Sequence, residues 1–306
     1  MIERLLEGDQ RVLARLISLV EDRSPGYREV LDRAFLHTGR AYRLGVTGPP
    51  GAGKSTIVDR LVPLLQDDFE KIGILACDPT SPFTRGALLG DRIRMREIDQ
   101  DEHVFIRSMA TRGALGGLAR AAEEAALLLE AAGFDLIIFE TIGVGQAEVD
   151  IVEAADSVIL VLTPQSGDAV QAMKAGLMEI ADIFVVNKSD LGAADLALNN
   201  LESILGLSPR EWSPPLVKAA ASRGEGIKEL KEQLDHHRAY LEGERLRKRR
   251  RARLKVFLKK IIEEELELRL WAGRGLEALN GKVEELLERR ASPYQVAEEV
   301  LEEIGG

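Results

Sequence analysis

The sequence has one cysteine, four histidines and no long hydrophobic run, and each shortage excludes a class of protein. Cys77 alone cannot close an intrachain disulfide, and the chain has no Cys/His cluster of the kind that binds structural zinc. The longest apolar runs, Phe134 to Phe139 and Val158 to Leu162, have the length of strands, whereas crossing a bilayer takes about 20 residues. The segment Met1 to Val20 is too charged for a secretory signal. We therefore expect a cytoplasmic protein with no membrane partner.

Basic residues are fewer than acidic ones. The 41 Lys and Arg against 51 Asp and Glu give a formal net charge of −10. Proteins that bind nucleic acids usually present a surplus of Lys and Arg to the phosphate backbone, so we expect no nucleic-acid partner. With 45% hydrophobic residues, the 306-residue chain can build one large domain or two ordinary ones with complete cores.

Short apolar runs alternate with longer helical stretches from Tyr42 to about Leu234. Strands separated by helices in this way form a parallel sheet with helices on both faces, so the pattern predicts an α/β domain over residues 42–234 with a central, mainly parallel β-sheet. The runs that have the length of buried strands are Leu44 to Thr47, Ile72 to Ala76, Val104 to Ile106, Leu136 to Phe139, Val158 to Leu162, Ile183 to Val186 and Leu216 to Val217.

The two ends of the chain are predicted to be helical extensions. In residues 1–41, four apolar side chains have the spacing of a helix that buries one face. They are Leu13, Leu16, Ile17 and Val20. Residues 235–306 are almost wholly helical in pattern and unusually charged, which predicts a C-terminal helical arm.

The arm begins with a strongly basic run. Glu244 to Lys260 contains ten Lys or Arg and one Glu, a local charge of +9 in a chain of −10. Such a run is either an anion or nucleic-acid patch, or a solvated helix face that pairs with the acidic run Glu263 to Glu267. We favour the solvated face, because the segment has a separate apolar stripe suited to packing on the domain or on a second copy. The stripe is Leu246, Leu254, Phe257, Leu258, Ile261 and Ile262.

A glycine-rich segment follows the first predicted strand and precedes a helix. Gly48 to Thr56 reads GPPGAGKST and satisfies the P-loop pattern G-x-x-x-x-G-K-[ST] in its required context. Glycines let consecutive backbone N–H groups of such a loop point at phosphate oxygens, and the helix N-terminus adds its dipole. Lys54 is expected to neutralise the outer phosphates and Ser55 to offer its hydroxyl to Mg²⁺. The segment therefore predicts the fold of a P-loop NTPase.

A second motif, Asn187-Lys188-Ser189-Asp190, follows a later strand of the same predicted sheet. A carboxylate at Asp190 can accept hydrogen bonds from guanine N1–H and the N2 amine together, whereas adenine has no such pair of donors on that edge. Asn187 is expected to brace the loop and Lys188 to lie along the base. The two motifs together predict that the nucleotide is GTP.

Acidic residues lie where a magnesium ion is needed. Asp78 and Glu140 come at the ends of predicted strands, and Asp91 lies between two strands. Carboxyl ends of parallel strands meet at one edge of the sheet, so we expect these three carboxylates and Ser55 to hold Mg²⁺ beside the phosphates. Glu140 and Lys54 are the residues expected to serve catalysis.

The motifs, taken in order, resemble those of one family. They read GPPGAGKST, ACDPTSP, RGALLGDRIRM, FETIGVGQAE, LTPQSGDAVQAMKAG, VVNKSD and GEGI, and all lie between Gly48 and Ile227. The chain resembles the MeaB/ArgK/MMAA group of P-loop GTPases over its whole length. This resemblance implies a Mg²⁺-dependent G-protein chaperone of a cobalamin-dependent acyl-CoA mutase, of the methylmalonyl-CoA mutase type, that gates cofactor loading and protection by hydrolysing GTP to GDP. It also implies a homodimer through the C-terminal arm, with the mutase's adenosyltransferase as a second candidate partner.

The resemblance also assigns residues. The family's magnesium acids fall on Asp78, Asp91 and Glu140, and the loop that communicates with the client enzyme includes Gln165, Asp168 and Lys174. The motifs and the resemblance together predict nucleotide contacts at Gly48, Pro50, Gly51, Ala52, Gly53, Lys54, Ser55, Thr56, Gly143, Asn187, Lys188, Asp190, Ala220 and Ala221.

Two positions depart from the family pattern. The usual Ser-Ala pair before Gly-x-Gly-Ile reads Ala220-Ala221, so a hydroxyl that steadies the guanine loop is missing, and the Ala221 N–H is expected to reach guanine O6. In the client loop, Gly-Asp-Glu reads Gly167-Asp168-Ala169, which removes one acid. Guanine specificity is therefore better supported than the choice of client.

Two other functions share parts of this plan. A nickel-inserting metallochaperone GTPase has a similar domain order, but it needs a His/Cys ligand cluster that Cys77 and four histidines do not provide. A transport-associated small-molecule kinase would need an acid or base beside an acceptor pocket, and nothing beyond the magnesium acids marks one. The GTPase chaperone is therefore the leading interpretation.

Overall fold

The computed structural model describes residues 1–78, 101–110, 117–141, 149–150, 153–164, 176–206, 211–271 and 274–305. The chain divides into two compact units, Met1–Arg253 and Leu254–Gly306. Among the helices in the described ranges, none is long and apolar enough to cross a membrane.

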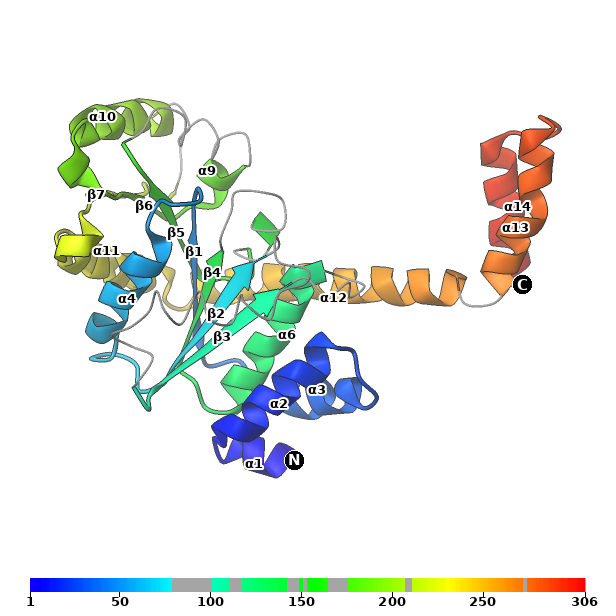
Figure 1. Cartoon of the computed structure of the whole chain (residues 1–306), viewed down its shortest axis with the longest axis horizontal. Helices are drawn as coiled ribbons and strands as arrows, with labels where there is room; N and C mark the ends of the chain where they lie inside the picture. The colour runs from blue at the N-terminus through cyan, green and yellow to red at the C-terminus, as the bar shows by residue number, and fades with distance from the viewer. Residues whose placement is uncertain are drawn as a thin grey trace. The chain divides into compact units, whose positions relative to one another are not determined.

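Seven strands of the first unit form one parallel sheet in the order β3-β2-β4-β1-β5-β6-β7 (Figure 1). The strands are β1 (Tyr42–Thr47), β2 (Ile72–Asp78), β3 (Val104–Ala110), β4 (Leu136–Thr141), β5 (Ser157–Leu162), β6 (Ile183–Val186) and β7 (Leu216–Lys218). The α/β fold and the strands predicted from the sequence are confirmed. The strand order reverses at β1, which lies between β4 and β5, so the loop after β1 opens into the crevice where such sheets bind ligands.

One face of the sheet is covered by α4 (Lys54–Leu65) and α11 (Ile227–Leu241). Leu61 of α4 and Leu230 of α11 are fully buried in one cluster with Val46 of β1 and Ile159 of β5. Successive strand residues point to opposite faces, so the other half of each strand is left for the helices beyond. The strands are consequently hydrophobic on both faces, as parallel strands between two helical layers are.

The opposite face is covered by α6 (Gly117–Ala131), and helices from the N-terminus pack against α6, namely α1 (Ile2–Leu6), α2 (Gln10–Glu21) and α3 (Tyr27–Phe35). Leu16 of α2 and Leu129 of α6 share a buried cluster with Phe139 of β4. The predicted apolar face of the N-terminal helix thus packs inside the first unit. Over β5 and β6, the same face is covered by α9 (Leu177–Ile180) and α10 (Ala194–Leu205).

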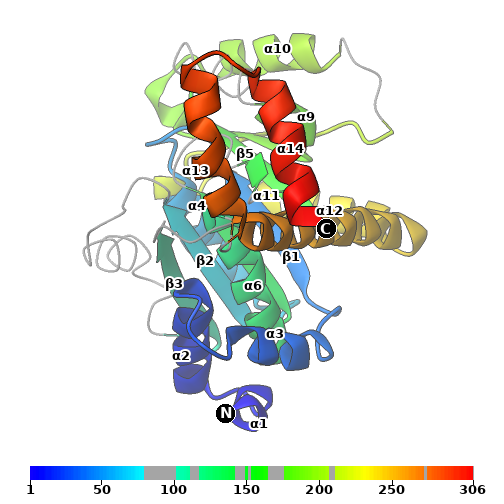
Figure 2. The ribbon, with the colours of Figure 1, turned by 90° about the vertical axis from the view of Figure 1, so that its right-hand side faces the viewer.

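The second unit contains the end of α12 (Glu244–Trp271), α13 (Arg274–Leu287) and α14 (Pro293–Gly305). Helices α13 and α14 pack side by side (Figure 2), and Lys282 Nζ lies 2.5 Å from Glu299 Oε2 across them. The first unit extends to Arg253, past the boundary that we place at 234/235 from the sequence, and α11 crosses that boundary. The three-part division of the chain stays a prediction.

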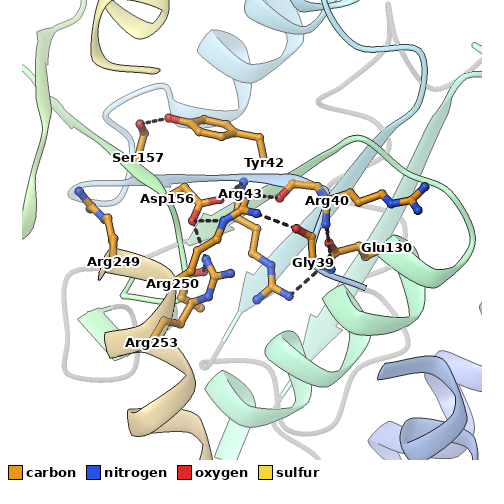
Figure 3. Close-up of polar contacts among 12 residues, drawn as sticks. Gly39, Arg40, Tyr42, Arg43, Glu130, Asp156, Ser157, Arg249, Arg250 and Arg253 are labelled. Atoms are coloured by element: carbon orange, nitrogen blue, oxygen red, sulfur yellow. Dashed lines mark hydrogen bonds and ion pairs between the residues drawn. The ribbon is translucent and has the colours of Figure 1, made fainter. Parts of the chain in front are cut away.

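The basic run of α12 begins with arginines that bind buried acids of the first unit, not with a solvated face. Arg249 donates to both oxygens of Asp182 at 3.0 and 2.8 Å. Arg250 and Arg253 contact Asp156 at 3.1 and 2.8 Å, and the Asp156 side chain is 0% exposed (Figure 3). Our interpretation of the run as a solvated face is wrong for these residues.

Further contacts fix the same helix start. Arg250 donates to the carbonyl oxygens of Gly39 and Ala41, both at 2.8 Å. Burial, together with the nearby charge of Arg43, lowers the pKa of Arg253 to about 10, which leaves this guanidinium protonated at neutral pH. Buried carboxylates need such partners, because an unpaired buried charge is strongly destabilising. The predicted pairing with the acidic run does occur further on, where Lys259 Nζ lies 3.4 Å from a Glu263 oxygen.

Candidate nucleotide site

The loop between β1 and α4 requires glycine at two positions. Gly48 has a φ of 144° and Gly53 a φ of 92°, both in the region that L side chains rarely adopt. A Cβ at Gly48 would lie 2.0 Å from the Val161 carbonyl oxygen of β5, and a Cβ at Gly53 would lie 2.4 Å from Asn187 Nδ2. The backbone thus approaches its neighbours too closely for any side chain there. The sequence pattern of a phosphate-binding loop is matched by the conformation of one.

Lys54, the first residue of α4, is folded back over this loop. Its side chain is buried, and Nζ donates to the carbonyl oxygens of Gly48 at 2.6 Å and Pro49 at 2.8 Å. The ammonium therefore lies in the concavity of the loop, beside the N-terminus of α4. An anion bound there would meet both the lysine charge and the helix dipole.

Ser55 and Glu140 lie in contact beside the loop. The Ser55 hydroxyl donates to Glu140 Oε1 at 2.5 Å, and Glu140 is 3% exposed. The contact follows from the sheet, because Glu140 of β4 is in register with Val46 of β1, just before the loop. A hydroxyl and a carboxylate are hard oxygen ligands of the kind that Mg²⁺ prefers. The two residues therefore fit the predicted ion.

The other predicted acids are placed less completely. Asp78 is the last residue of β2. The residue before it, Cys77, pairs with Thr141 of β4, so the Asp78 backbone lies at the same edge of the sheet as Glu140. Its side chain lies outside the described residues. So do several whole residues of our prediction: Asp91, Gly143, Gln165, Asp168 and Lys174. Their roles stay predictions.

A pocket of about 470 Å³ opens at this edge of the sheet. It is lined by the loop, the end of β4 and the segment after β6, namely by Pro50, Gly51, Gly53, Lys54, Ser55, Thr56, Glu140, Thr141 and Lys188. Thr141, which follows Glu140 in the motif FETIGVGQAE, also lines the pocket. Its hydroxyl donates to the Thr47 hydroxyl at 2.9 Å, which joins the ends of β4 and β1 under the pocket.

Asn187 joins the phosphate-binding loop to the loops that would hold the base. Its Nδ2 donates to the Ala52 carbonyl oxygen at 2.8 Å, and its Oδ1 accepts the Ala221 N–H at 3.0 Å. The side chain is 2% exposed. This is the bracing contact expected from the sequence. It also differs from expectation at Ala221, whose N–H has Asn187 as its acceptor where we expected guanine O6.

Asp190 lies in a short 3₁₀ turn, η1 (Ser189–Leu191), that follows β6. Its Oδ2 is 3.1 Å from a guanidinium nitrogen of Arg223, in the turn η2 (Ala221–Arg223) after β7. The Ser189 N–H donates to the Ala219 carbonyl oxygen at 3.0 Å, which holds the two turns side by side. The turns after β6 and β7 therefore form one surface next to the phosphate-binding loop.

Comparisons with known proteins agree with this geometry. The model of the family "Methylmalonyl Co-A mutase-associated GTPase MeaB" matches residues 13–275. A Pyrococcus abyssi protein is 47% identical over 316 residues, covering 100% of this chain and 96% of that protein. The GTPase ArgK of Escherichia coli is 38% identical, covering 89% of this chain and 85% of that protein. The crystal structure of a LAO/AO transport system kinase matches with a TM-score of 0.75 at 29% identity, covering 100% of this chain and 96% of that one.

Proposed function

The chain belongs to the family of methylmalonyl-CoA mutase-associated GTPases, and from this premise we propose that it is a Mg²⁺-dependent G-protein chaperone of a cobalamin-dependent acyl-CoA mutase. One observation carries the GTPase part: Lys54 and the Ser55–Glu140 pair line a single pocket at the carboxyl edge of the sheet, and Asn187 donates to the Ala52 carbonyl oxygen of the loop that forms it. The family match favours this function over nickel insertion or a small-molecule kinase.

In the proposed reaction, the N–H groups of the loop and Lys54 bind and orient the outer phosphates of GTP. A water attacks the γ-phosphorus, the bond from that phosphorus to the β–γ bridging oxygen breaks, and GDP and phosphate leave. Ser55 and Glu140, with the predicted ligands Asp78 and Asp91, would hold Mg²⁺, which would supply positive charge to the transferring phosphoryl group. Hydrolysis would then gate the loading and protection of the client's cobalamin.

Guanine specificity through Asp190 gives the first test. Asp190→Asn should weaken GTP binding by about 2–3 kcal/mol, the scale of a lost charged hydrogen-bond site. The asparagine amide can donate where xanthine has a carbonyl, so preference should shift toward XTP. Competition of GTP, XTP and ATP against a fluorescent GDP analogue measures both effects. Asp195→Asn, an exposed aspartate of α10, is the matched control and should change neither. Equal affinity of the native protein for ATP and GTP would contradict the assignment.

The chaperone part predicts slow hydrolysis that the client accelerates. Fast, partner-assisted GTPases often carry a water-orienting Gln after the switch glycine, but Val144 follows Gly143 here. We expect a low steady-state rate alone and a rate about tenfold higher with saturating methylmalonyl-CoA mutase, within the usual range of coupling between sites. Lys174→Ala should reduce the increase. A high basal rate, an increase that Lys174→Ala leaves intact, or a mutase that never co-purifies with the GTP-bound protein would each count against it.

The C-terminal arm, residues 235–306, is proposed to form a homodimer. Large apolar side chains on the part of α12 that belongs to the second unit are exposed, among them Leu258 at 56%, Ile262 at 49% and Leu266 at 60%. Exposed apolar side chains gathered on one element are typical of protein interfaces. The mutase's adenosyltransferase stays the second candidate partner, and the cytoplasm the proposed compartment.

A further inference from the structure

We propose that Arg223 is a positioning residue for guanine recognition: its guanidinium holds the Asp190 carboxylate in the orientation that accepts the two guanine N–H donors. The inference rests on the proposed role of Asp190 as the residue that reads the base. It extends that role to a side chain of a different loop, 33 positions further along the chain.

The two side chains of the ion pair differ in exposure, as a positioning role for Arg223 requires. The Asp190 side chain is 17% exposed and the Arg223 side chain is 59% exposed, with 3.1 Å between Oδ2 and the guanidinium nitrogen. The Asp190 side chain is therefore more enclosed than the Arg223 side chain, which reaches it from the solvent side. A carboxylate has about four lone-pair positions, so the oxygen that faces Arg223 can still accept an N–H from a base.

The backbone that carries Arg223 is fixed. The Arg223 N–H donates to the Ala220 carbonyl oxygen at 2.8 Å, and the turn ends at Gly224 with a φ of 75°. At Gly226, with a φ of 77°, a Cβ would lie 2.2 Å from the Lys218 carbonyl oxygen, so the loop is closed tightly on β7. Arg223 thus extends from a rigid turn rather than from a loose loop.

The side chains near Arg223 also bear on which group holds the Asp190 carboxylate. Ala219 to Ala221 carry only methyl groups and cannot restrain a carboxylate, whereas Ser222, directly before Arg223, carries a short hydroxyl side chain. The remaining links between the two turns, Asn187 with Ala221 and Ser189 with Ala219, fix backbone groups. The Arg223 guanidinium contacts the Asp190 carboxylate itself. Without it, Asp190 would sample rotamers that present only one oxygen to the base.

The test compares GDP with IDP, which lacks the N2 amine and so forms one hydrogen bond to Asp190 in place of two. Dissociation constants are measured for the full chain by competition against a fluorescent GDP analogue. Arg223→Ala should weaken GDP binding about three- to tenfold and IDP binding by less, in line with the loss of one ordered rotamer and an exposed ion pair. The GDP/IDP preference should therefore fall. Arg223→Lys, which keeps a cation, should restore most of it.

Two controls separate positioning from a general loss of charge. Lys218→Ala removes a nearby cation whose partner is Asp195, at 2.7 Å, and should leave the GDP/IDP preference unchanged. In an Asp190→Ala background, Arg223→Ala should have no further effect on that preference, because the arginine acts through the carboxylate.

Each other result overturns the inference. An unchanged GDP/IDP preference in Arg223→Ala shows that the arginine does not position Asp190, and tighter GDP binding shows that it competes with the base. Both results leave the guanine site itself standing. If Asp190→Ala keeps the native preference for GDP over IDP and ADP, the proposed base-reading role fails first, and the role of Arg223 fails with it.

Discussion

Glu140→Ala should lower GTP turnover by about a hundredfold or more while changing GDP affinity by less than about threefold. The buried Glu140 carboxylate accepts a hydrogen bond from the Ser55 hydroxyl at 2.5 Å, so the Ser55 oxygen and a Glu140 oxygen lie close enough together to bind one ion. GDP binding depends instead on the loop N–H groups and on Lys54, which donates to the carbonyl oxygens of Gly48 and Pro49. Single-turnover and steady-state hydrolysis at several Mg²⁺ concentrations, beside GDP titrations, separate the two effects.

Variants of the other predicted magnesium ligands test the same prediction further. If Ser55 and Glu140 hold the same ion, Ser55→Ala and Glu140→Ala should not add, and the double variant should be little slower than the slower single variant. Glu140→Gln keeps the shape of the side chain and tests whether its charge is what matters. Asp78→Ala applies the same assay to the predicted second carboxylate. Normal turnover and normal Mg²⁺ dependence in Glu140→Ala would place the metal elsewhere.

The parts of this molecule that the sequence predicts well are local. The strands are short apolar runs that stay buried on both faces, as in β5 and β6, so their existence depends little on what packs against them. The phosphate-binding loop is similar in part, because Gly48 and Gly53 have positive φ angles that the turn itself requires. The atoms that a Cβ would meet there belong to Val161 and Asn187, which are distant in the sequence. The bracing role of Asn187 could be expected from its motif. Its acceptor and donor, Ala52 and Ala221, could not, because they lie 135 and 34 positions away.

The basic run of α12 shows where such reasoning stops. Helical spacing predicts a helix over these residues, but it cannot show which charged side chains meet a buried acid. Arg249 lies 67 positions from Asp182, and Arg253 lies 97 positions from Asp156. Asp182 and Asp156 each come directly before a strand, and from the sequence alone they look like ordinary loop residues. The folded sheet buries the starts of β5 and β6, and the two aspartates there then need arginines as charge partners.

The arginine cluster predicts the largest effect on stability. Asp156→Ala should lower the free energy of unfolding by about 3–5 kcal/mol, because it leaves buried charges without their partner. Asp156 accepts from Arg250 at 3.1 Å, from Arg253 at 2.8 Å and from the Arg43 N–H at 3.1 Å, and its side chain is fully buried (Figure 3). Without the carboxylate, the guanidinium groups of Arg253 and Arg43 would repel each other in a medium that screens them poorly.

Urea and thermal unfolding of matched variants measure this effect. The chain has two tryptophans, Trp212 in the first unit and Trp271 at the end of α12, so a Trp271→Phe background makes fluorescence report on the first unit. In that background Asp156→Ala should lower the melting temperature by about 6–20 °C. Arg251→Ala is the control, because Arg251 is an exposed arginine of the same helix, and it should change stability by less than about 0.5 kcal/mol. Equal losses in the two variants would mean that α12 contributes only as a helix. A loss below about 1 kcal/mol in Asp156→Ala would mean that water solvates the cluster once the acid is gone.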